Sequence, residues 1–193
     1  MKIIFLGTNG GFTTETGNTP SILIDTKNYY VILDAGNGIH KLDQYIKEDK
    51  PIHLFISHLH IDHIEGLHVF PIFHFKNNMT IFVQKGQTDL LKIFVNVPYS
   101  HAFKNLKFQV DFKELNEENT LPYSLSTKLL NHVIPCIGMR FEIEEKIISY
   151  CTDTGVCDNA LLLGNNVDVF IHECSNFKNY DNSWGHVTPE IAG

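Results

Sequence analysis

Three histidines and one aspartate follow directly on a short apolar segment of the chain. The apolar segment covers 52–56, and the run after it contains His58, His60, Asp62 and His63. Because alternate residues of a strand point the same way, His58 and His60 can face one cation while Asp62 and His63 turn toward a second. Imidazole and carboxylate groups without thiolate suit zinc, and suit manganese or iron less strictly. The run predicts a two-metal site at the end of a strand, against the alternative of a histidine-rich surface loop.

The HxHxDH spacing of this run resembles the hallmark of the metallo-β-lactamase superfamily. Three earlier segments, 1–11, 18–24 and 31–38, are similar to the branch that contains ribonuclease Z and related phosphodiesterases. The resemblance implies an α/β fold, namely a four-layer αββα sandwich with mixed sheets and a dinuclear metal site at the strand ends. It also implies that Asp34 supports a metal-bound histidine without being a ligand itself.

Two segments further along the chain resemble the places where this branch supplies its next ligands. Segment 131–141 is similar to the histidine-to-glycine-arginine segment, which implies that His132 is the third ligand of the first metal. Segment 147–155 is similar to the strand that delivers a bridging carboxylate, which implies that Asp153 contacts both metals. Taken alone, His132 reads equally well as a strand-edge histidine, and Asp153 as a helix cap.

Segments 168–175 and 184–192 resemble the last two elements of the branch that this chain contains. The glycine-histidine-threonine loop of the second segment implies that His186 is a catalytic group that protonates the leaving group. His172, in the first segment, is expected to support the site from outside, or else simply to end a buried strand. Asp62 has a second expected role, because a ligand beside the nucleophile can also orient it.

The resemblance also implies one histidine ligand of the second metal that lies beyond Gly193. We therefore expect residues 1–193 to be a single metallo-β-lactamase-like domain that lacks its last helix and strand. The second metal then keeps Asp62, His63 and Asp153 from this chain. Two alternatives remain open: His186 takes the missing position, or the chain binds metal without catalysis.

Charge and length narrow the class of substrate. The chain has 193 residues, 43% of them hydrophobic, which suffices for one substantial core. Nucleic-acid enzymes usually carry a basic stripe, whereas this chain has 15 Lys and Arg against 22 Asp and Glu, a net charge of −7. The interval between His132 and Asp153 holds one short hairpin and has no room for the tRNA-gripping arm that bacterial ribonuclease Z carries there. Long nucleic acid is therefore disfavoured.

The function expected from these features is that of a metal-dependent hydrolase. Two divalent cations, zinc first, would hold a bridging water as hydroxide that attacks a small phosphodiester, such as a cyclic nucleotide or cyclic sugar phosphate. The first alternative is a ribonuclease Z-like tRNA 3′-end endonuclease. A thioester or lactam hydrolase is disfavoured, because Gly138, Arg140 and Gly185 belong to elements of the phosphodiesterase branch. Relatives in the branch often form dimers, so a homodimer is a further expectation, although the sequence shows no interface.

The four cysteines and the N-terminal sequence indicate the cellular compartment in which the protein is expected. Cys136, Cys151, Cys157 and Cys174 form no CxxC pair and are expected to be small buried hydrophobic residues in a reducing compartment. Thiolate ligation by Cys151 or Cys174 is a weaker alternative. The apolar stretch 3–6 is too short for a signal peptide or a membrane span, so we expect a cytoplasmic protein with no membrane contact.

Short β-branched runs alternate with a few amphipathic segments, as in a layered α/β protein. Strands are predicted near 2–6, 21–25, 30–33, 53–56, 80–83, 108–112, 126–130, 139–143, 147–151 and 167–171. Helices are predicted at 38–48, just after His63, at 88–95 and at 159–163. The aromatic and lysine residues of 85–107 are expected either to line a surface that binds a nucleobase or, as the simpler alternative, to pack over the core.

Overall fold

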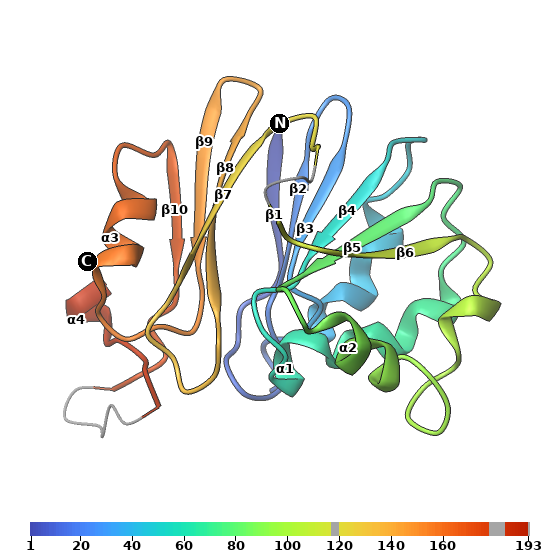
Figure 1. The fold of residues 1–193 in the computed structure, drawn as a ribbon, viewed down its shortest axis with the longest axis horizontal. Coiled ribbons are helices and arrows are strands. Elements are labelled where there is room, and N and C mark those ends of the chain that lie inside the picture. The colour runs from blue at the N-terminus through green and yellow to red at the C-terminus, as the bar shows by residue number, and fades with distance from the viewer. Residues whose placement is uncertain (117–119, 178–183, 193) are drawn as a thin grey trace. The chain divides into compact units, whose positions relative to one another are not determined.

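The structure is a computed structural model that describes residues 1–116, 120–177 and 184–192. The chain divides into two compact units, Met1–Glu118 and Asn119–Gly193, each built around its own sheet (Figure 1). Within the described ranges, no helix combines the length and the apolar character needed to cross a membrane.

Unit 1 is a six-stranded mixed sheet. Its strands follow chain order, and β1 to β3 are antiparallel while β3 to β6 are parallel. The strands are β1 (Lys2–Gly7), β2 (Ser21–Asp25), β3 (Tyr30–Leu33), β4 (Ile52–Phe55), β5 (Met79–Val83) and β6 (Val110–Glu114). Because parallel strands end at the same edge of a sheet, the loops after β3, β4 and β5 emerge together.

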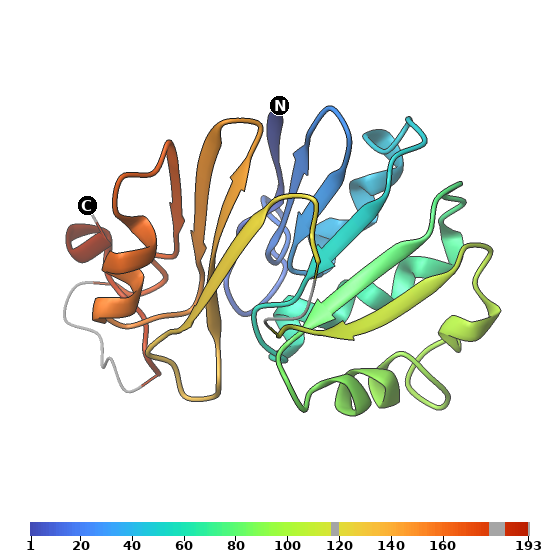
Figure 2. The same ribbon diagram turned by 45° about the horizontal axis from the view of Figure 1, so that its top comes forward.

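Helical segments lie along one face of this sheet (Figure 2). They are η1 (Asn37–Gln44), α1 (Ile61–Ile64), η2 (Glu65–Ile72), α2 (Thr88–Phe94) and η3 (Phe103–Asn105). Leu54 and Ile81 on the strands, and Ile56 directly after β4, pack with Leu67 and Phe70 of η2 in one buried apolar cluster. This core fixes the end of β4, from which the histidine-rich run begins.

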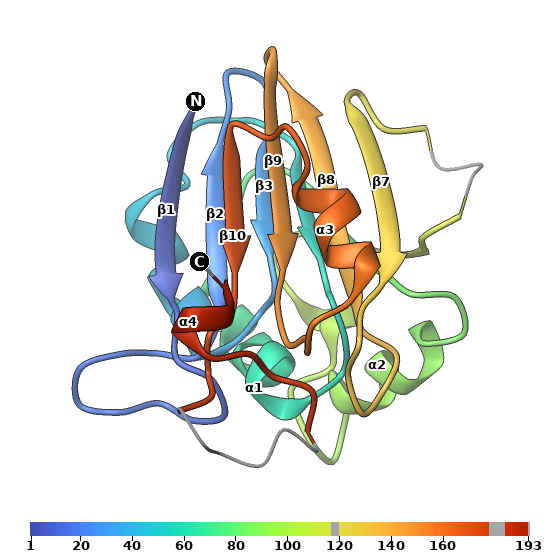
Figure 3. The same cartoon turned by 90° about the vertical axis from the view of Figure 1, so that its left-hand side faces the viewer.

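Unit 2 is a four-stranded mixed sheet in the order β10-β9-β8-β7 (Figure 3). Its strands are β7 (Ser124–Leu129), β8 (Ile137–Ile143), β9 (Lys146–Cys151) and β10 (Val169–His172), and its helices are α3 (Asp158–Gly164) and α4 (Pro189–Ala192). Strands β8 and β9 form the predicted hairpin, and β10 runs parallel to β9. Helix α3 lies against one face, where Leu163 and Ala160 join a small core with Cys136 and Cys151.

The predicted strands are all present, and β2 and β3 have their predicted bounds. One helix prediction was wrong in detail. The helix expected over 38–48 is a 3-10 helix that ends at Gln44, since the backbone N–H groups of Lys47 and Glu48 donate to the Tyr30 hydroxyl instead of extending it. The helix expected just after His63 is present as η2, and the turn α1 before it begins at Ile61, so Asp62 and His63 already lie in a helical turn.

Candidate metal centre

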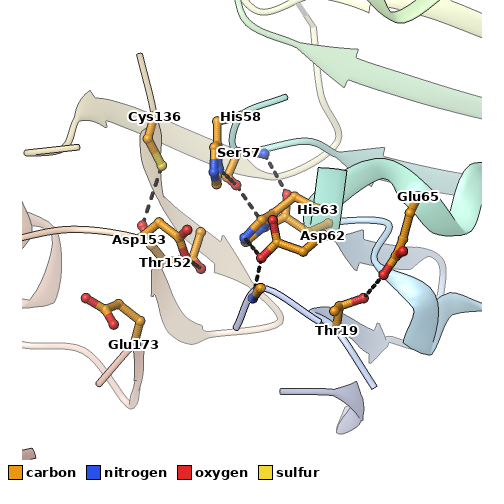
Figure 4. A network of polar contacts seen from close by, with 12 residues as sticks. Thr19, Ser57, His58, Asp62, His63, Glu65, Cys136, Thr152, Asp153 and Glu173 are labelled. Atoms are coloured by element: carbon orange, nitrogen blue, oxygen red, sulfur yellow. Dashed lines mark hydrogen bonds and ion pairs between the residues drawn. The ribbon is translucent and has the colours of Figure 1, made fainter. Parts of the chain in front are cut away.

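Unit 1 brings its four predicted ligands together. The ring of His58 lies 4.7 Å from that of His60 and 4.2 Å from that of His63, between ring centroids. The Nε2 atom of His63 lies 3.4 Å from Oδ2 of Asp62. His58 and His63 are fully buried and Asp62 nearly so. Figure 4 shows His58, Asp62 and His63 pointing toward one another.

The local backbone explains how six consecutive residues converge. His60 is extended and precedes α1, and the N–H of His63 donates to the His60 carbonyl at 3.0 Å. This single helical turn brings Asp62 and His63 back toward the end of β4. A side chain at Gly36 would meet the Asp62 carbonyl oxygen at 2.4 Å, so only glycine permits this close approach.

Asp34 is hydrogen-bonded to the segment that carries the cluster. Its carboxylate accepts hydrogen bonds from the backbone N–H of Ser57 at 2.7 Å, the Ser57 hydroxyl at 2.8 Å and Nδ1 of His63 at 2.8 Å. Because a carboxylate only accepts, Nδ1 of His63 carries the proton, and Nε2 keeps its lone pair for a cation. Asp34 was predicted to support a metal-binding histidine, and that role requires this contact with His63. The role itself stays a prediction.

Asp62 has a second fixed contact, with the loop between β1 and β2. The backbone N–H of Gly11 donates to Oδ2 of Asp62 at 2.8 Å. A hydrogen bond to a charged oxygen is stronger than one between neutral groups, so this contact fixes the orientation of the carboxylate. The loop and the predicted ligand are thus tied together within unit 1.

Unit 2 holds the other predicted residues. Nε2 of His132 lies 3.9 Å from Oδ2 of Asp153, and the His132 ring centroid lies 5.3 Å from that of His186. The N–H of Gly155 donates to the Asn131 carbonyl at 2.8 Å, which fixes the segment of His132 beside that of Asp153. The Thr152 hydroxyl donates to Asp153 at 3.0 Å, and both residues appear in Figure 4.

Glu173 is a site residue that the sequence analysis did not single out. Its carboxylate accepts hydrogen bonds from the N–H groups of Val187 at 2.8 Å and Ser175 at 2.6 Å, and lies 3.5 Å from Nδ1 of His186. Glu173 therefore positions the loop that carries His186. The only signal in the sequence was a carboxylate at the end of a predicted strand. His172, for which a supporting role was predicted, contacts the Glu173 carbonyl through Nδ1, and that role stays untested.

Glu173 is expected to make stability depend on pH. Burial by itself raises the pKa of Glu173, but its hydrogen bonds with His186, Ser175 and Val187 outweigh burial and hold the pKa below the ordinary value. A depressed pKa contributes stability above the unfolded-state pKa and loses it as pH falls through the folded-state value. We expect Glu173→Gln to lose less unfolding free energy than the wild type between pH 6 and pH 3, measured by urea denaturation. An identical loss in both proteins would contradict this, and Glu142→Gln, at an exposed position on β8, serves as the control.

The cysteines do not add to the donor set. All four lie in the described residues, and none is in a disulfide. Burial raises the pKa of Cys151 to about 12, which disfavours the thiolate that a metal needs. Cys136 and Cys151 are buried as expected, whereas the prediction was wrong for Cys174, which is exposed because it follows the end of β10.

The donor types fit divalent cations. His58 and His60 in unit 1, and His132 and Asp153 in unit 2, each pair ligand atoms within 4.8 Å. Buried imidazole and carboxylate groups of this kind suit zinc, with manganese or iron as alternatives. The identity and number of the metals stay predictions.

Comparison with known proteins identifies a matching family model and relatives by sequence. Residues 1–187 match the family model described as anti-Pycsar protein Apyc1. The chain is 25% identical, over all of its length and 80% of the relative, to the probable metallo-hydrolase YhfI of Bacillus subtilis. It is 30% identical over 155 residues to ribonuclease Z of Staphylococcus epidermidis, covering 74% of this chain but only 49% of that enzyme.

Solved structures agree on the fold. The crystal structure of YhfI from Bacillus subtilis has a TM-score of 0.76 at 21% identity, covering 96% of this chain and 77% of that chain. Human tRNase Z, short form, has a TM-score of 0.78 at 20% identity, covering 100% of this chain and 86% of that chain. The chain spans about half the length of the ribonuclease Z relatives that it matches in sequence.

Proposed function

Because the chain belongs to the family of anti-Pycsar protein Apyc1, in the ribonuclease Z-like branch of the metallo-β-lactamase superfamily, we propose that it is a metal-dependent phosphodiesterase. Its substrate is a small phosphodiester, such as a cyclic nucleotide or a cyclic sugar phosphate. The superfamily and the metallo-β-lactamase fold predicted from HxHxDH are confirmed by these relatives. The activity and the substrate are our proposal.

The observation that supports the proposal best is the convergence of His58, His60, Asp62 and His63 on one another in a buried cluster. We propose that these residues, together with His132 and Asp153, hold two divalent cations, as family membership implies. The cations would activate a water molecule and offset the negative charge that builds on the phosphate oxygens. Neither water activation nor charge stabilisation requires the positively charged groove with which a protein binds a long nucleic acid.

The chain's own residues supply the positioning. Asp62, fixed by the N–H of Gly11, orients the attacking water, while Asp34 keeps His63 in the tautomer that leaves Nε2 available. His186 gives its proton to the departing alkoxide. Since Nδ1 of His186 faces Glu173 at 3.5 Å, Nε2 is the atom that donates this proton.

The preference for a small substrate rests on charge and on unit 2. A net charge of −7 repels a polyanion. The chain between His132 and Asp153 is occupied by the β8–β9 hairpin, with no further element inserted. Ribonuclease Z activity is the second candidate, favoured by the 30% identity to those enzymes over 155 residues.

A substrate panel tests the proposal. Wild-type protein with added zinc or manganese is expected to hydrolyse a 3′,5′-cyclic nucleotide with a higher kcat/KM than precursor tRNA, and to leave a chromogenic lactam intact. Cleavage of precursor tRNA at its 3′ end with the higher kcat/KM would select the second candidate. Bound zinc, measured by atomic emission, without turnover of any substrate would indicate a metal-binding protein without catalysis.

His186→Gln is expected to lower kcat more for a substrate with a poor leaving group than for one with a good leaving group. An alkoxide needs protonation as it departs, whereas p-nitrophenolate does not, so kcat should fall about 100-fold on a cyclic nucleotide and much less on bis(p-nitrophenyl) phosphate. Steady-state kinetics of both proteins on both substrates measure the difference. His40→Gln, at an exposed position on η1, is the matched control. An equal loss on the two substrates would show that His186 is not the general acid.

A further inference from the structure

The loop between β1 and β2 is held in a defined conformation by its own backbone. The N–H groups of Thr8 and Asn9 both donate to the Asn18 carbonyl at 2.9 Å, which closes the base of the loop. Nearer the tip, the N–H of Thr14 donates to the Gly17 carbonyl at 2.9 Å. These bonds restrict the backbone between them, so the residues at the tip occupy fixed positions.

The tip of this loop is anchored to a predicted metal ligand. Gly11 donates its N–H to Oδ2 of Asp62 at 2.8 Å and has a φ of +75°, a conformation that glycine adopts without strain. Phe12 is the next residue, and its Cα is one peptide unit from that of Gly11. The Cα of Phe12 therefore lies within about 8 Å of the Asp62 carboxylate.

Phe12 is exposed in spite of this anchoring. Its exposed fraction is 70%, and its neighbours along the loop, Thr13 and Thr14, are polar. The core of unit 1 takes its aromatic rings from other segments, among them Phe55, Phe70 and Phe73. A phenylalanine held at a fixed position but packed into no core is available to contact a ligand.

We propose that Phe12 stacks on the base of a nucleotide substrate whose phosphodiester lies at the metal ligands. This inference rests on the proposed function and assigns Phe12 to binding the base of a nucleotide substrate. A flat apolar ring gains affinity from any base, because every base offers a π face. Phe12 acts in binding and takes no part in bond cleavage.

The test compares substrates with and without a base. For Phe12→Ala, the ratio of the KM for a 3′,5′-cyclic nucleotide to the KM for methyl riboside 3′,5′-cyclic phosphate is expected to rise about tenfold, a loss typical of one stacked base. The kcat for the cyclic nucleotide should change by less than about twofold, since uniform binding affects KM alone. Phe12→Tyr should restore the wild-type ratio. Tyr99→Ala, which removes a ring that is 68% exposed in another loop, is the control.

Several results would overturn the inference. If Phe12→Ala leaves the KM ratio unchanged while the wild type hydrolyses both compounds, the phosphodiesterase proposal survives and the stacking role is wrong. If neither compound is hydrolysed by the wild type, both proposals fall. If sedimentation shows that Phe12→Ala dissociates a wild-type dimer without changing the ratio, Phe12 belongs to an interface between copies of the chain.

Discussion

Asp62→Asn is expected to lower kcat on a phosphodiester by about a thousandfold, the upper range for losing one charge-stabilising group. The amide keeps the size of the carboxylate and still accepts the N–H of Gly11 through its oxygen, so the loop contact survives. What is lost is the negative charge that binds a cation and orients water. Turnover of bis(p-nitrophenyl) phosphate with added zinc or manganese measures the effect.

Two further measurements make this result specific to the site. Thermal unfolding followed by circular dichroism should show that Asp62→Asn remains folded, and metal analysis should show a reduced cation content. Asp43→Asn, an exposed position on η1, is the matched control and should match the wild type in turnover and metal content. Turnover by Asp62→Asn close to the wild-type rate would exclude the role assigned to Asp62.

Asp34→Asn is expected to have the largest effect on stability. Asp34 is 0% exposed and accepts three hydrogen bonds from Ser57 and His63, so an amide NH₂ group would face a buried donor. The charge is lost as well, and together these changes should lower the unfolding free energy by about 2–4 kcal/mol. Asparagine tolerates the left-handed backbone of this position, where φ is 58°, so backbone strain does not confuse the result. Urea denaturation of the metal-free protein gives the value.

The matched comparison is Asp111→Asn, whose carboxylate accepts an exposed hydrogen bond from Gln109. Its urea midpoint should stay close to that of the wild type. Zinc affinity should also separate the two variants, because losing a group that orients a ligand lowers affinity about 10- to 100-fold. Equal midpoints for Asp34→Asn and the wild type would show that Asp34 does not hold the cluster.

Strands were predictable because their apolar runs are short and bounded by turn residues. Strands β2 and β3 begin and end where the sequence placed them. Strand β6 was predicted over 108–112 but begins at Val110, since Phe108 packs into the core from the loop before the strand. A buried phenylalanine in a loop and one in a strand give the same local pattern, so periodicity alone cannot separate them.

The candidate site was predictable where its residues are close in sequence. His58, His60, Asp62 and His63 share one run, and the structure brings them together. Glu173 was missed because nothing in the sequence marks its contacts with Val187 and His186, which lie 14 and 13 positions further along the chain. No spacing rule applies to such a pair; only the end of β10 meeting that loop reveals it.

Two aspartates of the predicted site have left-handed backbones, with φ of 58° at Asp34 and 44° at Asp153. Such a backbone costs most residues other than glycine about 1–2 kcal/mol, and costs Asp and Asn less, because their side chains can form local hydrogen bonds. Substituting glycine at either position would relax the chain locally while removing a carboxylate. At Asp34 the loss of three buried hydrogen bonds outweighs that relaxation, so a search for thermostable variants that scores stability alone endangers Asp153 and not Asp34. Thermostability and the proposed activity are therefore opposed at Asp153, and selection for one must be checked against the other.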